Sequence, residues 1–246
     1  MGPVAVGVYA VAYGVAAILN QSTTIMNSTL YPRLSADWEK EKFDEVKTFY
    51  ASFFGWYSIL VIPAAVGIVM TGRPILRLLS TATTAQRGVV VIPILVLGFA
   101  FRGMEDVFVL GVSASERTRE IGGVTLAGAI LNVIFNLILI PIIGLVGAAI
   151  ATATVQFLKT AVMYRLLTHK IELAIPYRQV LKAGVATTVM AGGLYLLNWL
   201  SWIQQLFVFP PAGIFIYFTV LASIDGLPEP IEVILSKKID SIDISL

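Results

Sequence analysis

Residues 121–166 read IGGVTLAGAILNVIFNLILIPIIGLVGAAIATATVQFLKTAVMYRL, a run in which only Lys159 and Arg165 carry charge. An α-helix needs about 20 mostly apolar residues to cross about 30 Å of hydrocarbon. The run is long enough for two such helices, and Pro141 and Gly144 divide it near its middle, as a tight turn between helices would. This stretch therefore predicts two successive membrane-spanning helices, at about 121–141 and 144–166.

The same pattern extends outward from this stretch in both directions. Five further apolar runs of comparable length lie at about 4–31, 49–71, 88–114, 180–199 and 206–224. The chain of 246 residues is 57% hydrophobic and only 13% charged, whereas soluble domains carry about 25% charged residues. We therefore predict an all-α fold, a polytopic membrane helical bundle of about seven transmembrane helices over residues 1–224, followed by a more polar cytoplasmic tail at 225–246.

The positive charges predict how the bundle is oriented, because Lys and Arg collect in the loops that stay in the cytoplasm. On one side of the predicted spans lie Arg33, Lys40, Lys42, Lys47, Arg117, Arg119, Arg165, Lys170, Arg178, Lys182, Lys237 and Lys238, and on the other lie Arg73, Arg77 and Arg87. This asymmetry places the N-terminus outside the cell membrane and the C-terminus in the cytoplasm. Residues 72–79, on the outer side, alternate charge with apolar residues and predict a short helix lying in the interface.

Several classes of function lack support in the sequence. The absence of Cys excludes thiolate metal sites and Cys nucleophiles. A net charge of +2, without a basic face, argues against nucleic-acid partners. The single His169 lies beside Lys170 in a connector, and no metalloprotease, phosphate-loop or dinucleotide motif is present. We therefore expect a protein that is not an enzyme and needs no metal or cofactor.

Three ionisable residues interrupt the run at 88–114: Arg102, Glu105 and Asp106. Each costs about 2.5 to 3.5 kcal/mol at the centre of a membrane helix, so such groups usually face a protein interior or a water-filled cavity. At spacings of three and four, Arg102 shares a helix face with both acids, so one acid can be paired while the other titrates or binds a cation. Two interpretations stay open: a cavity-lining cluster, or charges near the cytoplasmic interface of a span whose ends lie elsewhere.

Neutral polar residues recur at helical spacing on two further spans, as Gln21, Thr24 and Asn27 and as Asn132 and Asn136. Such side chains either line a cavity or bond neighbouring helices. Gln156 and Lys159 have the same two interpretations, since Lys159 can also snorkel to the membrane edge.

Short motifs elsewhere in the chain follow one another in a recognisable order. They are Gly7-Val8-Tyr9 with Ala12-Tyr13, Leu30-Tyr31-Pro32, the segment Ile62 to Gly67, Leu131-Asn132 through Asn136-Leu137, Leu139-Ile140-Pro141 with Gly144, and Gly147 to Thr152. The pattern resembles that of polysaccharide and oligosaccharide flippases of the multidrug/oligosaccharidyl-lipid/polysaccharide exporter superfamily, from about Gly2 to Leu167. Members of that family have about fourteen spans in two bundles around a polar cavity.

The resemblance implies that this chain supplies the later bundle, beginning at that bundle's second helix. The expected function is export of a lipid-linked oligosaccharide or polysaccharide precursor by alternating access, and the expected partners are that lipid-linked sugar, membrane lipid and a second membrane chain that completes the cavity. The expected cavity residues are Gln21, Asn27, Arg102, Glu105, Asp106 and Asn132. Arg102 would meet a pyrophosphate or an acidic sugar, and Glu105 or Asp106 would bind a coupling cation.

Three alternatives stay open at this point. A drug or metabolite antiporter of the same superfamily would surround one acid with aromatic residues rather than form a wide polar cavity. A membrane-embedded glycosyltransferase would need a charged outer loop, and the outer connectors here are short. The chain could also be an assembly subunit that does not itself transport.

Overall fold

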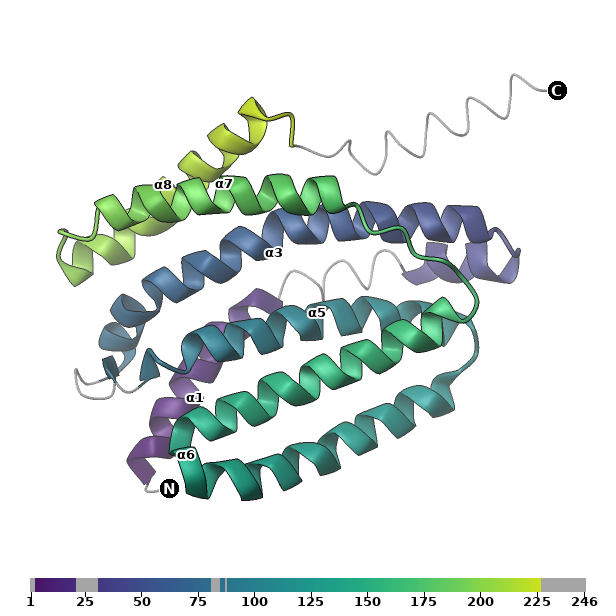
Figure 1. Ribbon diagram of the computed structural model, residues 1–246, viewed down its shortest axis with the longest axis horizontal. Coiled ribbons are helices and arrows are strands. Elements are labelled where there is room, and N and C mark those ends of the chain that lie inside the picture. Colours follow the sequence, from purple (N-terminus) through teal and green to yellow (C-terminus); the bar gives the residue numbers. More distant parts are fainter. Residues whose placement is uncertain (1–2, 21–30, 81–84, 87, 227–246) are drawn as a thin grey trace.

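The computed structural model describes residues 3–20, 31–80, 85–86 and 88–226, and every regular element among them is helical (Figure 1). The elements are α1 (Pro3–Ala17), the short 3-10 helix η1 (Ile18–Asn20), a helical stretch at 31–39, α3 (Phe43–Leu79), α5 (Ile92–Ala114), α6 (Thr118–Thr168), α7 (Tyr177–Leu196) and α8 (Trp202–Ser223). The prediction of an all-α chain is confirmed.

The long element α6 is two helices joined at a sharp break. Gly144 there has φ 61° and ψ −131°, a backbone conformation that residues with a Cβ avoid. The break turns the chain back on itself, so α6 forms a hairpin whose two arms run side by side (Figure 1). The two arms coincide with the spans predicted at 121–141 and 144–166.

The helices lie side by side across the molecule in an order that differs from their order in the chain. The second arm of α6 and α5 lie together, α3 lies on α5, and α7 and α8 cover the far side of α3 (Figure 1). α1 crosses both α5 and α3. The larger apolar core joins α1, α3, α5 and α6, whereas a second core joins α3, α7 and α8. This arrangement leaves the first arm of α6 at one edge of the bundle.

Large apolar side chains are exposed on the surface of the bundle, as contact with lipid favours. Among the described residues, Leu137, Ile142, Phe207 and Phe215 are each 72% exposed. By length and composition, α3, α6 and α8 can each cross a membrane. α5 is long enough but contains three charged residues around its central residue, Gly103.

One boundary differs from the sequence-based expectations. The prediction of a separate interfacial helix at 72–79 is wrong, because α3 continues without interruption to Leu79. Gly72, Pro74 and Leu76 are buried, so tertiary packing holds this charged end in the helix. The first span is predicted to reach residue 31. Its described part runs to Asn20, and residues 21–30 lie outside the described residues, as does the tail from residue 227.

Candidate substrate cavity

A cavity of about 860 Å³ lies between α1 and the two arms of α6. Its lining mixes polar and apolar residues, and we call it the polar cavity because it has more polar residues than the groove described below. Its polar lining residues are Tyr9, Tyr13, Thr125, Asn132, Asn136, Thr152, Gln156 and Lys159. Those on the first arm of α6 follow one another at spacings of seven and four residues, and those on the second arm at four and three. Such spacings place side chains on one face of a helix. The turn at Gly144 then brings the two polar faces together, so the cavity depends on both arms.

Hydrogen bonds among the lining residues shape the wall of the cavity. The Asn136 amide nitrogen donates to the Asn132 amide oxygen at 2.9 Å, one turn along the first arm. The hydroxyls of Tyr9 and Thr152 share a hydrogen bond of 3.0 Å, which ties α1 to the second arm. The amide nitrogen of Asn132 has no partner among the described residues, so it is available to a ligand in the cavity.

A partly buried ion pair adjoins the cavity. Lys159 Nζ lies 2.9 Å from Glu105 Oε1, and the two side chains are 19% and 6% exposed. Glu105 comes from α5 and Lys159 from the second arm of α6, where Lys159 also lines the cavity. Glu105 of α5 thus forms an ion pair with a residue of α6. Arg102, which shares a helix face with Glu105, is exposed instead.

Of the predicted site residues that the structure describes, only Asn132 and Glu105 lie at or beside this cavity. Asn132 lines the cavity, and Glu105 adjoins it through Lys159. Asp106 is directed toward the end of α1 and η1, where its carboxylate accepts a hydrogen bond of 3.2 Å from the Asn20 amide. Arg102 lies outside the lining of this cavity. The other two predicted residues, Gln21 and Asn27, lie outside the described residues.

Sequence reasoning did not assign Tyr9 or Thr152 to the site. Tyr9 and Thr152 stood out only as parts of the family motifs Gly7-Val8-Tyr9 and Gly147 to Thr152. A signal for Thr152 was present, since it precedes Gln156 by one helical turn on the face that ends in Lys159. No comparable signal predicts the contact between Tyr9 and Thr152, because they lie on different helices.

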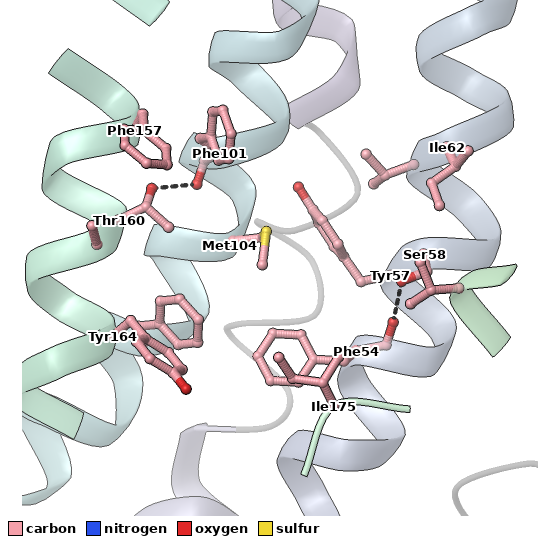
Figure 2. Close-up of a pocket in the computed structure, with 14 residues that line it drawn as sticks. Phe54, Tyr57, Ser58, Ile62, Phe101, Met104, Phe157, Thr160, Tyr164 and Ile175 are labelled. Atoms are coloured by element: carbon pink, nitrogen blue, oxygen red, sulfur yellow. Dashed lines mark hydrogen bonds between the residues drawn. The ribbon is translucent and has the colours of Figure 1, made fainter. Parts of the chain in front are cut away.

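A second, apolar groove of about 460 Å³ lies between α3, α5 and the second arm of α6 (Figure 2). Its lining includes Phe54, Tyr57, Phe101, Met104, Phe108, Phe157 and Tyr164. Two of its hydroxyls are already bonded: Thr160 donates to the Phe101 carbonyl at 2.8 Å, and Ser58 donates to the Phe54 carbonyl at 2.7 Å (Figure 2). This groove therefore suits a hydrocarbon chain rather than a sugar.

Neither space has the ligands of a preformed acidic metal site. Among the described residues, no three His, Cys, Asp or Glu side chains gather closely enough to hold a metal ion. The polar cavity instead offers amides, hydroxyls and one ammonium group, which are the groups that hydrogen-bond sugars and phosphates.

Comparisons with known proteins agree with this description. Residues 8–212 match the family described as lipid II flippase MurJ. The probable low-salt glycan biosynthesis flippase Agl15 of Haloferax volcanii is 27% identical over 234 residues, which are 92% of this chain and 48% of that protein. The probable flippase AglR of the same organism is 27% identical over 201 residues, 79% of this chain and 41% of that protein.

A solved structure, lipid II flippase MurJ in an inward closed conformation, shares the fold. It superposes with a TM-score of 0.69 at 18% sequence identity, over 89% of this chain and 45% of that one. The chain thus spans somewhat less than half the length of the relatives it matches.

Proposed function

The chain belongs to the family described as lipid II flippase MurJ, and from this premise we propose that it takes part in moving a lipid-linked oligosaccharide or polysaccharide precursor across the cell membrane. The observation that carries the proposal is the polar cavity between α1 and the arms of α6. Its volume of about 860 Å³ is at the upper end of the usual range for small-molecule sites, about 300 to 1,000 Å³. A site of this size suits a sugar headgroup.

The chemistry of the lining favours a sugar over a drug cation. Amide and hydroxyl groups on both arms of α6 can exchange hydrogen bonds with sugar hydroxyls. A cation site would need an acid in its lining, but no acidic residue is among those that line this cavity, and the Glu105 carboxylate beside it pairs with Lys159. The reaction we propose is a transfer across the membrane without covalent change, so the chain acts as a transporter and not as an enzyme.

We further propose that a second bundle completes the pathway. The relatives are about twice as long as the matched region, and alternating access requires two bundles that rock around a shared site. The second bundle would come from another membrane chain or from another part of the same protein. Co-purification with a second polytopic membrane protein would support this arrangement, and transport by a purified homogeneous chain at the full rate would contradict it.

Flipping of a fluorescent lipid-linked oligosaccharide in reconstituted vesicles tests the function directly. The chain is reconstituted with and without its co-purifying partner, and protein-free vesicles give the background rate. The double variant Asn132→Leu, Asn136→Leu removes the polar wall of the first arm and is expected to bring flipping to background. The matched control, Ile134→Leu, lies exposed on the same arm and is expected to leave flipping unchanged. Equal rates for the native chain and the double variant would contradict the proposal.

We also propose that the N-terminus lies outside and the C-terminus in the cytoplasm, as the distribution of Lys and Arg predicts. The chain contains no Cys, so single cysteines can report on topology without background. Lys170→Cys, between α6 and α7, is expected to react with a membrane-impermeant maleimide only after permeabilisation. Asn198→Cys, between α7 and α8, is expected to react in intact cells. The reverse pattern would invert the proposed orientation.

A further inference from the structure

The ion pair of Glu105 and Lys159 has hydrogen-bonding capacity that the described part of the chain does not use. An ammonium group carries three N–H donors, and that of Lys159 meets Glu105 Oε1 at 2.9 Å and no other acceptor among the described residues. The second carboxylate oxygen, Glu105 Oε2, is buried without a hydrogen-bond partner within the same part of the chain. Glu105 is buried, whereas the Lys159 side chain is 19% exposed and lines the cavity, so the unused N–H donors of the ammonium group are open to a ligand there.

The unused donors lie at the wall of the polar cavity. Lys159 is one of its lining residues, and its side chain is more exposed than that of Glu105 behind it. Gln156 lies beside Lys159 on the second arm, and Thr125 and Asn132 line the cavity from the first arm. These three side chains carry N–H or O–H donors. An anion in this part of the cavity would therefore meet one ammonium group, already paired with Glu105 on its other side, and several neutral donors.

Gly128 fits the Lys159 side chain closely against the first arm. A Cβ at Gly128 would lie 2.6 Å from Lys159 Cδ and 3.0 Å from Lys159 Cγ. The lysine stem thus rests on bare backbone, where any larger residue would displace it. Contact with Gly128 on one side and with Glu105 on the other sets the place of the ammonium group.

We propose that Lys159 binds the phosphate or pyrophosphate group of the lipid-linked substrate, and that Glu105 is a positioning residue that holds the Lys159 ammonium at the cavity wall. Phosphate oxygens form charge-assisted hydrogen bonds with an ammonium group, roughly twice as strong as neutral ones. Because Lys159 has donors to spare, it can bind the anion without releasing Glu105. Arg102, to which the sequence assigned this role, does not line the cavity.

This inference rests on the proposed function and adds the group that recognises the anionic part of the substrate. A phosphate group could also belong to a phospholipid of the surrounding bilayer. The test below therefore compares three probes: farnesyl pyrophosphate, farnesol as its uncharged counterpart, and phosphatidylglycerol as a membrane lipid with a phosphate.

Binding is measured on the full chain in detergent micelles. The native chain is expected to bind farnesyl pyrophosphate more tightly than farnesol or phosphatidylglycerol. In the variant Glu105→Gln, Lys159→Met, which leaves no unpaired buried charge, farnesyl pyrophosphate is expected to bind about ten- to a hundredfold more weakly, the loss expected for one charge-assisted hydrogen bond. Farnesol binding is expected to stay unchanged, and Lys159→Arg is expected to retain most of the affinity.

The charge-swapped variant Glu105→Lys, Lys159→Glu separates the positioning role from a purely structural one. It keeps an ion pair between α5 and α6 but places the carboxylate on the cavity side. If the pair only clamps two helices, this variant binds farnesyl pyrophosphate as the native chain does. Under our proposal it unfolds at a similar denaturant concentration but no longer prefers farnesyl pyrophosphate to farnesol.

A glycine pair on the first arm gives a second test that keeps both charges. Gly128→Ala is expected to displace Lys159 and weaken farnesyl pyrophosphate binding, whereas Gly123→Ala, where an added Cβ meets no atom within 4 Å, is expected to leave it unchanged. If the Gln/Met or charge-swapped variants do not fold, the comparison of Gly128→Ala with Gly123→Ala tests whether the position of Lys159 sets the affinity for farnesyl pyrophosphate.

Three results would overturn the assignment. The native chain could bind farnesyl pyrophosphate no better than farnesol, or phosphatidylglycerol could compete equally well, which would make this a bilayer lipid site. The affinity could also depend on Arg102, with loss in Arg102→Gln and none in the Lys159 variants. Failure of the proposed function looks different: farnesyl pyrophosphate binding would depend on Lys159, yet reconstituted vesicles with the partner bundle would show no flipping above background.

Discussion

Replacement of Gly147 by Ala should push the two arms of α6 apart. An added Cβ would lie 2.5 Å from the carbonyl oxygen and 2.7 Å from the carbonyl carbon of Leu139, both backbone atoms of the first arm. Real Cβ atoms essentially never approach other atoms closer than 3.0 Å, so the arms must separate by at least 0.5 Å, the difference between 3.0 and 2.5 Å. Backbone atoms cannot rotate away as a side chain can, so the strain cannot be relieved locally.

The net effect follows from two opposing terms. Overpacking of this kind costs about 1 to 3 kcal/mol, whereas Gly to Ala within a helix gains up to about 1 kcal/mol. We therefore expect Gly147→Ala to lower the free energy of unfolding by up to about 2 kcal/mol. Reversible unfolding in mixed detergent micelles, followed by circular dichroism, measures it.

Gly123→Ala is the matched control for this prediction. It lies on the first arm of the same hairpin, and an added Cβ there meets no atom within 4 Å. Only the gain in helix propensity remains, so this variant should be more stable than the native chain by up to about 1 kcal/mol. Changes of the same sign and size in both variants would refute the reasoning, because the close approach at Gly147 would then have no energetic consequence.

Three further substitutions have expected outcomes. Gly144→Ala adds no clash but forces a Cβ into a conformation with φ 61°, and is expected to lower the free energy of unfolding by about 1 to 3 kcal/mol; native-like stability would contradict this. Tyr217→Phe removes the 2.8 Å hydrogen bond to the Ile59 carbonyl that joins α8 to α3. It is expected to lower the free energy of unfolding by about 0.6 to 1.5 kcal/mol in the same measurement. An unchanged unfolding midpoint would show that this hydrogen bond does not contribute to stability. Ser201→Ala breaks the capping box with Gln204 and should cost about 1 kcal/mol, seen as faster amide exchange confined to the first turn of α8; uniform or absent acceleration would argue against a capping role.

The helical spans could be predicted from the sequence because they depend on local composition. The two arms of α6 cover residues 121–141 and 144–166, as predicted. In lipid, a single long apolar segment can bond all its backbone N–H and C=O groups within itself only by forming a helix. Likewise, a sharp turn between two such runs favours glycine, and Gly144 has a positive φ that glycine adopts readily. The family resemblance noted from short motifs is also confirmed, by a match over residues 8–212.

The end of α3 could not be predicted in the same way. Residues 72–79 contain two arginines at helical spacing, which locally favours a helix at the membrane surface. In the structure Gly72, Pro74 and Leu76 are buried by other parts of the chain, and a Cβ on Gly72 would collide with Ile92. Such long-range burial leaves no trace in local hydropathy.

The sequence by itself determined that this chain is a bundle of apolar helices from a flippase family, and that α5 carries charges near its middle. Only the tertiary structure decided that Glu105 pairs with Lys159 and that Tyr9 reaches Thr152. Helical periodicity shows which side chains share a face of one helix. Which faces meet depends on the rotation and register of packed helices, and these are set by contacts between residues far apart in the chain.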